Sequence, residues 1–421
     1  MNQIIALCFY AGISLLAFGA VYMPSVLGYF AASPGIPLLF VAGSLAACRT
    51  LLAKRPDGLS RDTLLLVFSG IPLSIIGFFW YGVDARLLGK FCTLLILCFV
   101  WLSPLVCSSA RLYRSHNLKL ILSLGLGISV VALVLSDYLQ VLPQIVRNLV
   151  FSEAFQTPVD ARPRGFMEEA SHFAAYGGVC LLNLFLLRER GRLFSLTRFL
   201  SFSLILIGYL FAIGSKGSII GVAIALLAIG MSWRRLHYLL LALPGFYVLA
   251  LSQVQVLSAD ISQYTSVATR LGMGGAAVLG IAHNPFGYGY YGFYGAFANF
   301  GMDVMELLGS YLPLNLSEFA DIMSSMQNIS AKSTLLDFTL IFGVFFVYFL
   351  WRTLRRMDLA DTRVRFSLTY VFLVFLSNSG HLSLMFFLSL AVLVHNYPRA
   401  EKKPLAGRAD DGQALETPAP L

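Results

Sequence analysis

Charged residues are scarce in this chain: Asp, Glu, Lys and Arg make up 12% of its 421 residues, while apolar residues make up 58%. Soluble globular domains carry about 25% charged residues, so this composition excludes an ordinary soluble fold. The apolar residues gather in runs of roughly 16 to 22 residues, which is the length that crosses the hydrocarbon core of a bilayer. The composition therefore predicts an all-α polytopic membrane protein.

Several familiar sequence signals are absent. The first residues lack the basic segment of a secretory signal peptide, so we expect a retained helix there. The six cysteines form no CxxC pair and no metal-ligand spacing, which predicts packing and no disulfide framework. No Walker loop, dinucleotide fingerprint, HExxH pair or GxSxG elbow occurs. We therefore expect no cofactor, no metal and no direct use of ATP through a known loop.

The apolar runs predict about twelve transmembrane helices. Their approximate ranges are 4–20, 36–53, 63–80, 91–108, 119–136, 172–187, 199–214, 217–232, 236–252, 333–351, 366–378 and 381–395. The net charge is +9, and 22 of the 30 basic residues lie in alternate short loops and the C-terminal tail. This pattern reports topology and gives no reason to expect a nucleic-acid partner; by the positive-inside rule, both termini are cytoplasmic. We expect a transmembrane domain over 1–397 and a disordered cytoplasmic tail over 398–421.

Two predicted outer segments, 137–171 and 253–332, are too long to be simple connectors. In the first, apolar residues recur at helical spacing beside polar neighbours, which predicts a short amphipathic helix on the membrane surface. In the second, residues 302–326 show a looser amphipathic pattern that Pro313 interrupts. Function is expected in these two segments.

A dense group of charged and polar residues ends the first segment, directly before a span. Its members are Arg162, Arg164, Glu168, Glu169 and His172. On a helix, Glu168 and His172 stand on one face, with Glu169 about 100° round from Glu168. A carboxylate there can accept a proton from a hydroxyl, while either arginine pairs with phosphate oxygens. The alternative is a solvated loop whose glutamates favour a helix N-terminus.

Three further cations are predicted on the outer side. Lys216 lies between glycines in a turn between two spans, where it either faces an anion or extends along a helix end to the membrane surface. Arg270 precedes a predicted short helix and is a candidate phosphate ligand. Lys332 begins the next span close to Asp337, and a salt-bridged helix end explains this pair as well as function does.

The run of glycines and tyrosines over 283–295 is expected to be flexible and aromatic. It either stacks on sugar rings or forms an interfacial aromatic belt. Tyr288 and His283 are counted as candidate substrate contacts. His283 has no partner at metal-ligand spacing, so a hydrogen-bonding or structural role is favoured over a metal site.

The order of these elements resembles the O-antigen polymerase and ligase superfamily, often called the Wzy type, over about residues 160 to 350. The family segment reads like R-x-x-G-(F/L)-x-x-E-P-S-H-F-A, and Ala170 replaces the usual proline here. The matching residues are Arg162, Gly165, Phe166, Glu169, Ser171, His172, Phe173 and Ala174. The family's other features resemble the turn 215–217, Arg270, the stretch 284–289, and 332–343. Residues 327–333 lack the His-Asn pair usual in ligases, which favours a polymerase.

The resemblance implies a metal-independent inverting glycosyltransferase at the periplasmic face of the bacterial inner membrane. Its donor and acceptor would be undecaprenyl-diphosphate-linked oligosaccharides, and the growing glycan would move en bloc onto a new repeat unit. Glu169 would act as the base, with His172 second and Glu168 beside them. The cations that would bind the diphosphate are Arg162, Arg164, Lys216, Arg270 and Lys332.

The same resemblance implies further partners and leaves other functions open. Membrane lipids, a chain-length regulator and a flippase of the same pathway are the implied partners. An O-antigen ligase would use the same donor and pass the glycan to lipid A core. A flippase or other transporter would need ionisable residues deep in its spans, and this sequence has few.

Overall fold

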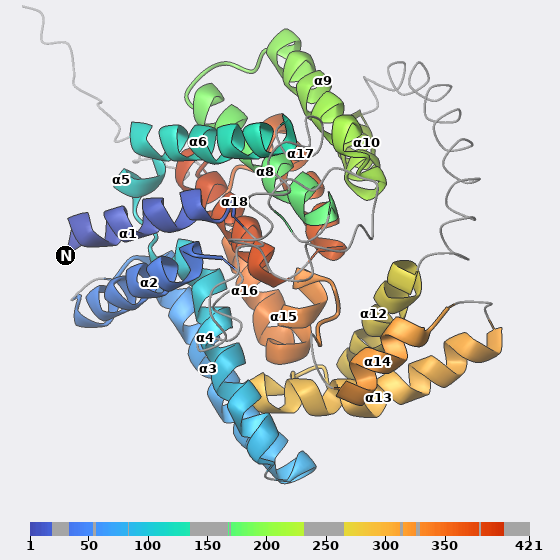
Figure 1. The fold of residues 1–421 in the computed structure, drawn as a ribbon. Helices are drawn as coiled ribbons and strands as arrows, with labels where there is room; N and C mark the ends of the chain where they lie inside the picture. The colour runs from blue at the N-terminus through green and yellow to red at the C-terminus, as the bar shows by residue number, and fades with distance from the viewer. Residues whose placement is uncertain are drawn as a thin grey trace, which may run out of the picture.

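The computed structural model describes residues 1–18, 33–53, 56–82, 84–134, 167, 170–230, 265–311, 315–325, 329–378 and 380–399. These residues form helices joined by short turns, with no β-strand within them and one isolated bridge between Met357 and Pro398 (Figure 1). The helices are α1 (Asn2–Leu15), α2 (Gly35–Leu52), α3 (Gly58–Tyr81), α4 (Ala85–Val106), α5 (Ala110–Tyr113), α6 (His116–Ala132), α8 (Ala170–Glu189), α9 (Leu196–Ile213), α10 (Lys216–Gly230), α12 (Thr265–His283), α13 (Gly289–Tyr311), α14 (Ser317–Ser325), α15 (Thr334–Phe342), α16 (Val344–Leu354), α17 (Thr362–Leu376), the 3-10 turn η5 (Gly380–Leu382) and α18 (Ser383–Asn396).

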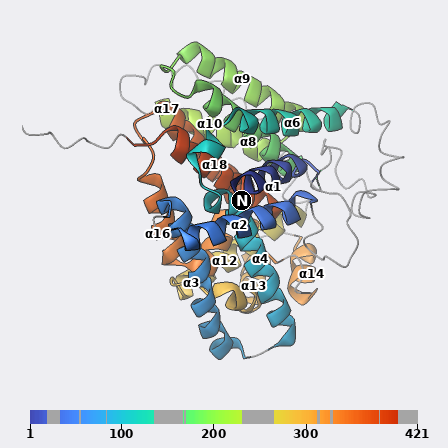
Figure 2. The same cartoon turned by 90° about the vertical axis from the view of Figure 1, so that its left-hand side faces the viewer.

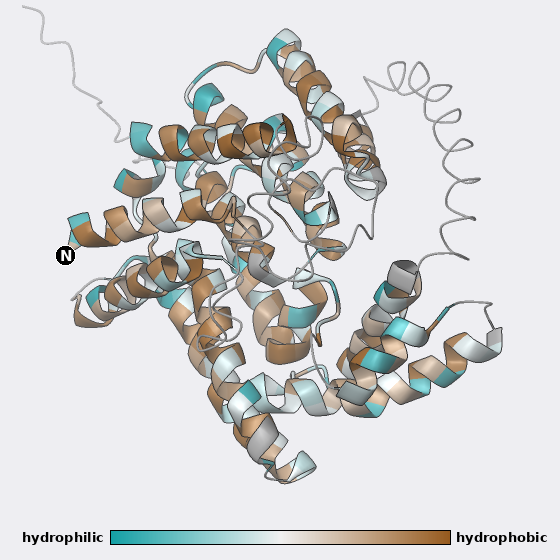
Figure 3. Ribbon diagram, in the orientation of Figure 1, coloured by the Kyte–Doolittle hydropathy of each residue, from teal (hydrophilic) through white to brown (hydrophobic). Residues whose placement is uncertain are grey.

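Four of the described helices are long and apolar enough to cross a membrane. They are Gly35–Leu52, Gly58–Tyr81, Leu87–Val106 and Leu196–Ile213. Shorter apolar helices accompany them, and Figure 3 shows hydrophobic residues along the helices with hydrophilic ones mostly near their ends. The all-α membrane class is confirmed for the described residues, whereas the count of twelve spans stays a prediction. The expected span 236–252, most of 137–171 and most of the tail lie outside these residues.

Helix α18 forms the centre of the core. Every residue from Ser383 to Leu393 is buried, which is typical of a helix that neighbours surround on all sides. Figures 1 and 2 show α4, α8 and α17 around it. Its Ser389 accepts a hydrogen bond from the Asn183 amide of α8 at 3.1 Å, so this polar pair joins the two helices inside the core.

The predicted span 333–351 is two helices and not one. Gly343 has φ +56° and separates α15 from α16. The break frees backbone groups, and the loop before α13 binds them: the Val344 amide donates to the Pro285 carbonyl at 2.9 Å, and the Tyr288 amide donates to the Leu340 carbonyl at 2.9 Å. A break inside an apolar segment is tolerated because these partners satisfy it. The single-helix prediction is therefore wrong at this position.

The prediction of a flexible glycine and tyrosine run is also wrong. Residues 289–295 of this run form the start of α13, which packs across α3 and α4 (Figure 1). Tyr290 is fully buried; its hydroxyl donates to the Val67 carbonyl at 2.8 Å, and its amide donates to the Ser74 hydroxyl at 2.7 Å. Close backbone approach explains the glycines, since Gly292 lies against Gly77 of α3. The segment is thus a packing element.

We expect Gly343→Ala to destabilise the protein. A Cβ at this position would meet the backbone of Phe286, and the positive φ alone costs an L-residue about 1–3 kcal/mol. Thermal unfolding of the purified protein in detergent should show a clear fall in Tm. The matched control is Gly208→Ala on an exposed face of α9, where a Cβ meets nothing within 4 Å and the Tm should hold or rise. Equal Tm values for the two variants would contradict this account of the break.

Candidate functional site

The start of α8, where the first predicted outer segment ends, is described in part. The chain is described at Met167 and again from Ala170, and Met167 is fully buried. Four predicted site residues lie outside the described ones: Arg162, Arg164, Glu168 and Glu169. His172, the second candidate for the base, lies in the first turn of α8 and is half-buried. The assignments of Glu169, Glu168 and His172 as acid and base therefore stay predictions.

Arg270 joins the two predicted outer segments. It lies in the second turn of α12 and is half-buried, and its Nη2 donates a hydrogen bond to the Ser171 hydroxyl at 3.3 Å. The two residues are 99 positions apart in the chain. Ser171 directly precedes His172, so the guanidinium lies beside the segment that carries the predicted acids and base. The sequence predicts Arg270 as a candidate ligand, but it does not predict the hydrogen bond to Ser171.

Lys216 is the first residue of α10. The preceding Gly214 adopts a left-handed conformation with φ +71° and ends α9, which turns the chain back on itself. Because consecutive helices alternate in direction, this turn lies at the same end of the bundle as the start of α8. A contact supports this: the hydroxyl of Tyr209, near the end of α9, donates to the Phe173 carbonyl at 3.2 Å. Figure 1 shows α8, α9 and α10 as neighbours. The backbone of Lys216 thus lies on the Arg270 side of these helices.

Lys332 lies in a turn that Asp337 holds in place. The Asp337 carboxylate accepts the Ser330 hydroxyl at 2.6 Å and the Ala331 amide at 2.6 Å. Lys332 has φ +55°, a conformation rare for residues other than glycine, and its amide donates to the Ser330 hydroxyl at 3.0 Å. Such strain is kept only where surrounding contacts enforce it. The role of Ser330 was not predicted from the sequence. Its hydroxyl becomes a partner of Asp337 only when the turn before α15 forms.

The last two predicted contacts are His283, which ends α12, and Tyr288, which lies in the loop between α12 and α13. Tyr288 is 2% exposed and its hydroxyl donates to the Gly280 carbonyl at 3.1 Å. Its ring is therefore not available to stack on a sugar, and it drops out of the candidate contacts. His283 ends α12 on an exposed face, with its ring 5.4 Å from that of Phe300. Across the described part of the chain, no group of three or more His, Cys, Asp or Glu is placed to hold a metal ion.

Comparison with known proteins gives one informative relative. No family model matches the chain. It is 29% identical over 278 residues to a protein of Klebsiella pneumoniae named "Uncharacterized 49.5 kDa protein in cps region". The matched region covers 62% of this chain and 60% of the relative, so the chain spans less than two thirds of that protein's length.

Asp337→Ala should destabilise the turn that carries Lys332. The change leaves the Ser330 hydroxyl and the buried Ala331 amide without their acceptor, which costs about 1–3 kcal/mol for each buried group. Thermal unfolding in detergent should show a lower Tm. The control is Asp337→Asn, whose carbonyl oxygen can still accept the Ala331 amide and should keep most of the stability. An unchanged Tm for Asp337→Ala would show that the carboxylate does not hold this turn.

Proposed function

We propose that this protein is a polysaccharide polymerase that joins lipid-linked repeat units outside the cytoplasm. The relative supports a role in polysaccharide biosynthesis, because cps denotes capsular polysaccharide. The apolar helices support an enzyme whose substrates are held in a membrane by their lipid carriers. The substrate is then an oligosaccharide joined through a diphosphate to undecaprenol, at the periplasmic face of the bacterial inner membrane.

The observation that carries the proposal is the hydrogen bond from Arg270 to Ser171. A guanidinium from the second outer segment lies beside the segment with the predicted acids. A glycosyl transfer from a diphosphate needs both chemistries in one place, because the attacking hydroxyl loses a proton while the departing diphosphate gains negative charge. No group is needed beyond side chains that this sequence supplies.

The reaction would proceed as a single displacement. Glu169, or His172 in its place, accepts the proton of the acceptor sugar hydroxyl as that oxygen bonds to the anomeric carbon of the donor glycan. The bond between the anomeric carbon and the diphosphate oxygen breaks, which inverts the anomeric centre and releases undecaprenyl diphosphate. Cations stabilise the charge on the leaving group. The proposed set is Arg162, Arg164, Lys216, Arg270 and Lys332.

A strain that lacks the protein should accumulate undecaprenyl diphosphate carrying single repeat units, since chain extension alone is lost. Extraction of the lipid-linked glycans and mass spectrometry would measure their lengths. Long polymer left on the carrier would instead identify a ligase and overturn the proposal. Repeat units retained in the cytoplasmic leaflet would identify a transporter and overturn it as well.

Point variants test the chemistry directly. Glu169→Gln should abolish chain extension in membranes supplied with lipid-linked repeat units, and Arg270→Gln should lower the rate by about 10²-fold, the typical effect of losing one charge-stabilising contact. Arg270→Lys keeps the charge but loses the bidentate geometry, so an intermediate rate is expected. Arg365→Gln, at an exposed position of α17, is the matched control and should extend chains normally. Normal long chains from Glu169→Gln would reject the proposed base.

A further inference from the structure

A buried acid gathers arginines at the opposite end of the molecule. Asp62, in the first turns of α3, has a side chain that is 5% exposed. Its Oδ2 accepts a hydrogen bond from Arg356 Nη2 at 2.6 Å and lies 3.3 Å from Arg352 Nη2. Arg61 Nε lies 3.7 Å from its Oδ1. One carboxylate therefore faces three guanidinium groups, from α3, from α16 and from the turn that follows α16.

The charges in this cluster do not balance. A fourth guanidinium, that of Arg355, lies over the Trp351 ring, with its Cζ 3.8 Å from the ring centre. Arg356 Nη1 is buried and has no hydrogen-bond partner among the residues that the structure describes. Like charges this close repel one another, and the repulsion is relieved when an anion binds between them. The cluster thus has donors and positive charge in excess of its single acid.

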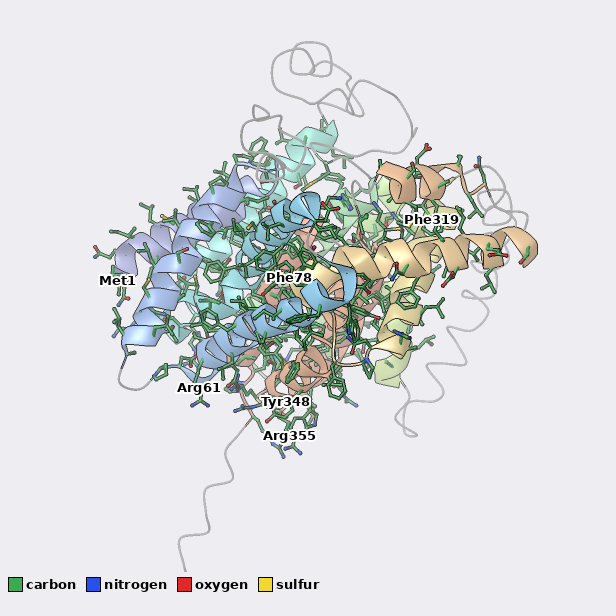
Figure 4. The ribbon with its side chains drawn as sticks, turned by 90° about the horizontal axis from the view of Figure 1, so that it is seen from below. Met1, Arg61, Phe78, Phe319, Tyr348 and Arg355 are labelled. Carbon is green, nitrogen blue, oxygen red and sulfur yellow. The ribbon has the colours of Figure 1, made fainter. Side chains whose placement is uncertain are left out.

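The arginines line an open surface hollow at the end of α16. The hollow has a volume of about 500 Å³ and its lining residues, which we call the arginine pocket, are Tyr348, Trp351, Arg352, Arg355 and Arg356. Figure 4 shows Arg61, Tyr348 and Arg355 together at one edge of the molecule. A volume of this size accommodates a small ligand. Guanidinium groups pair with phosphate oxygens in bidentate geometry, so the chemistry that fits is a phosphate anion.

Apolar side chains continue away from the arginine pocket on both helices. On α16, Val347 and Val344 are exposed one and two turns before Trp351. On α3, Leu65 and Phe68 are exposed on the turns that follow Arg61. In water these faces would be unfavourable, but beside a bilayer they suit acyl chains. A ligand that fits the whole surface has an anionic phosphate at one end and hydrocarbon chains that extend along α3 and α16.

We propose that the arginine pocket binds the headgroup phosphate of an anionic phospholipid of the phosphatidylglycerol or cardiolipin type. The positive-inside pattern assigns this end to the cytoplasmic leaflet, where a basic pocket at a helix end is suited to such headgroups. Asp62 positions Arg352 and Arg356, while Arg355 contacts the phosphate from the Trp351 ring. The inference is independent of the proposed polymerase, because its residues lie on α3 and α16 and take no part in glycosyl transfer.

Native mass spectrometry of the full chain, purified in detergent and titrated with cardiolipin, phosphatidylglycerol or phosphatidylethanolamine, tests the proposal. The wild type should bind the two anionic lipids in preference to phosphatidylethanolamine. Each arginine near the membrane surface contributes about fivefold in affinity, so Arg355→Gln should weaken anionic lipid binding about fivefold, and Arg352→Gln with Arg355→Gln about 25-fold. The single variant leaves the Asp62 contacts intact, so it keeps the test valid if the double variant fails to fold.

The matched control removes two other basic residues from the predicted cytoplasmic loops. Arg188→Gln with Arg365→Gln changes the net charge by the same amount at exposed positions on α8 and α17, and it should bind lipid as the wild type does. Equal loss in both double variants would overturn the proposal, because binding would then depend on net charge alone. Equal binding of all three lipids would overturn it too. Inorganic pyrophosphate that displaces cardiolipin at micromolar concentration would show that a soluble phosphate is the ligand and reject the lipid.

Discussion

The structure depends on one constraint of the bilayer: backbone polar groups inside an apolar region need partners from the protein itself. The break between α15 and α16 meets this constraint in an unusual way. The Leu340 carbonyl and the Val344 amide take their partners from Tyr288 and Pro285, in a loop that connects α12 to α13. Gly287, with φ +94°, and Gly343 allow the two backbones to come together without a Cβ between them. A loop in a predicted outer segment is thereby held against the break, with Gly287 and Tyr288 buried and Phe286 exposed.

Helix class and approximate position follow from the sequence wherever one apolar run makes one helix. For α3 and α4, the runs 63–80 and 91–108 lie within or close to Gly58–Tyr81 and Ala85–Val106. Composition decides this because chain length across the bilayer and the cost of unpaired backbone leave few alternatives. The break at Gly343 was not predictable in the same way. Apolar residues continue on both sides of it, and the groups that satisfy it lie more than fifty residues earlier in the chain.

In the candidate site, too, the sequence predicts some features and not others. Arg270 was identifiable because a cation in a predicted outer segment is conspicuous among apolar runs. Its hydrogen bond to Ser171 was not, because serine carries no charge and the contact depends on how α8 and α12 pack. The prediction of Tyr288 as a sugar contact was wrong because its sequence signal fits two structures. An aromatic residue among glycines is typical of a mobile binding segment and also of close helix packing, and periodicity does not separate the two. Beside the arginine pocket, Asp62 directly precedes an apolar run, and only the fold reveals that Arg352 of α16 and Arg356 just after it contact this acid.

The pair of helices α15 and α16 also connects the two ends of the molecule. The turn with Lys332 and Asp337 lies at the start of α15, and the arginine pocket lies at the end of α16. The loop that binds the break follows directly after α12, the helix that carries Arg270. The backbone contacts at Gly343 and the packing of α12 against α15 therefore act together in placing Arg270 relative to Lys332, in addition to the hydrogen bonds around each cation. Because close-packed backbone allows little adjustment, a change at the break should displace both cations, even though neither contacts it.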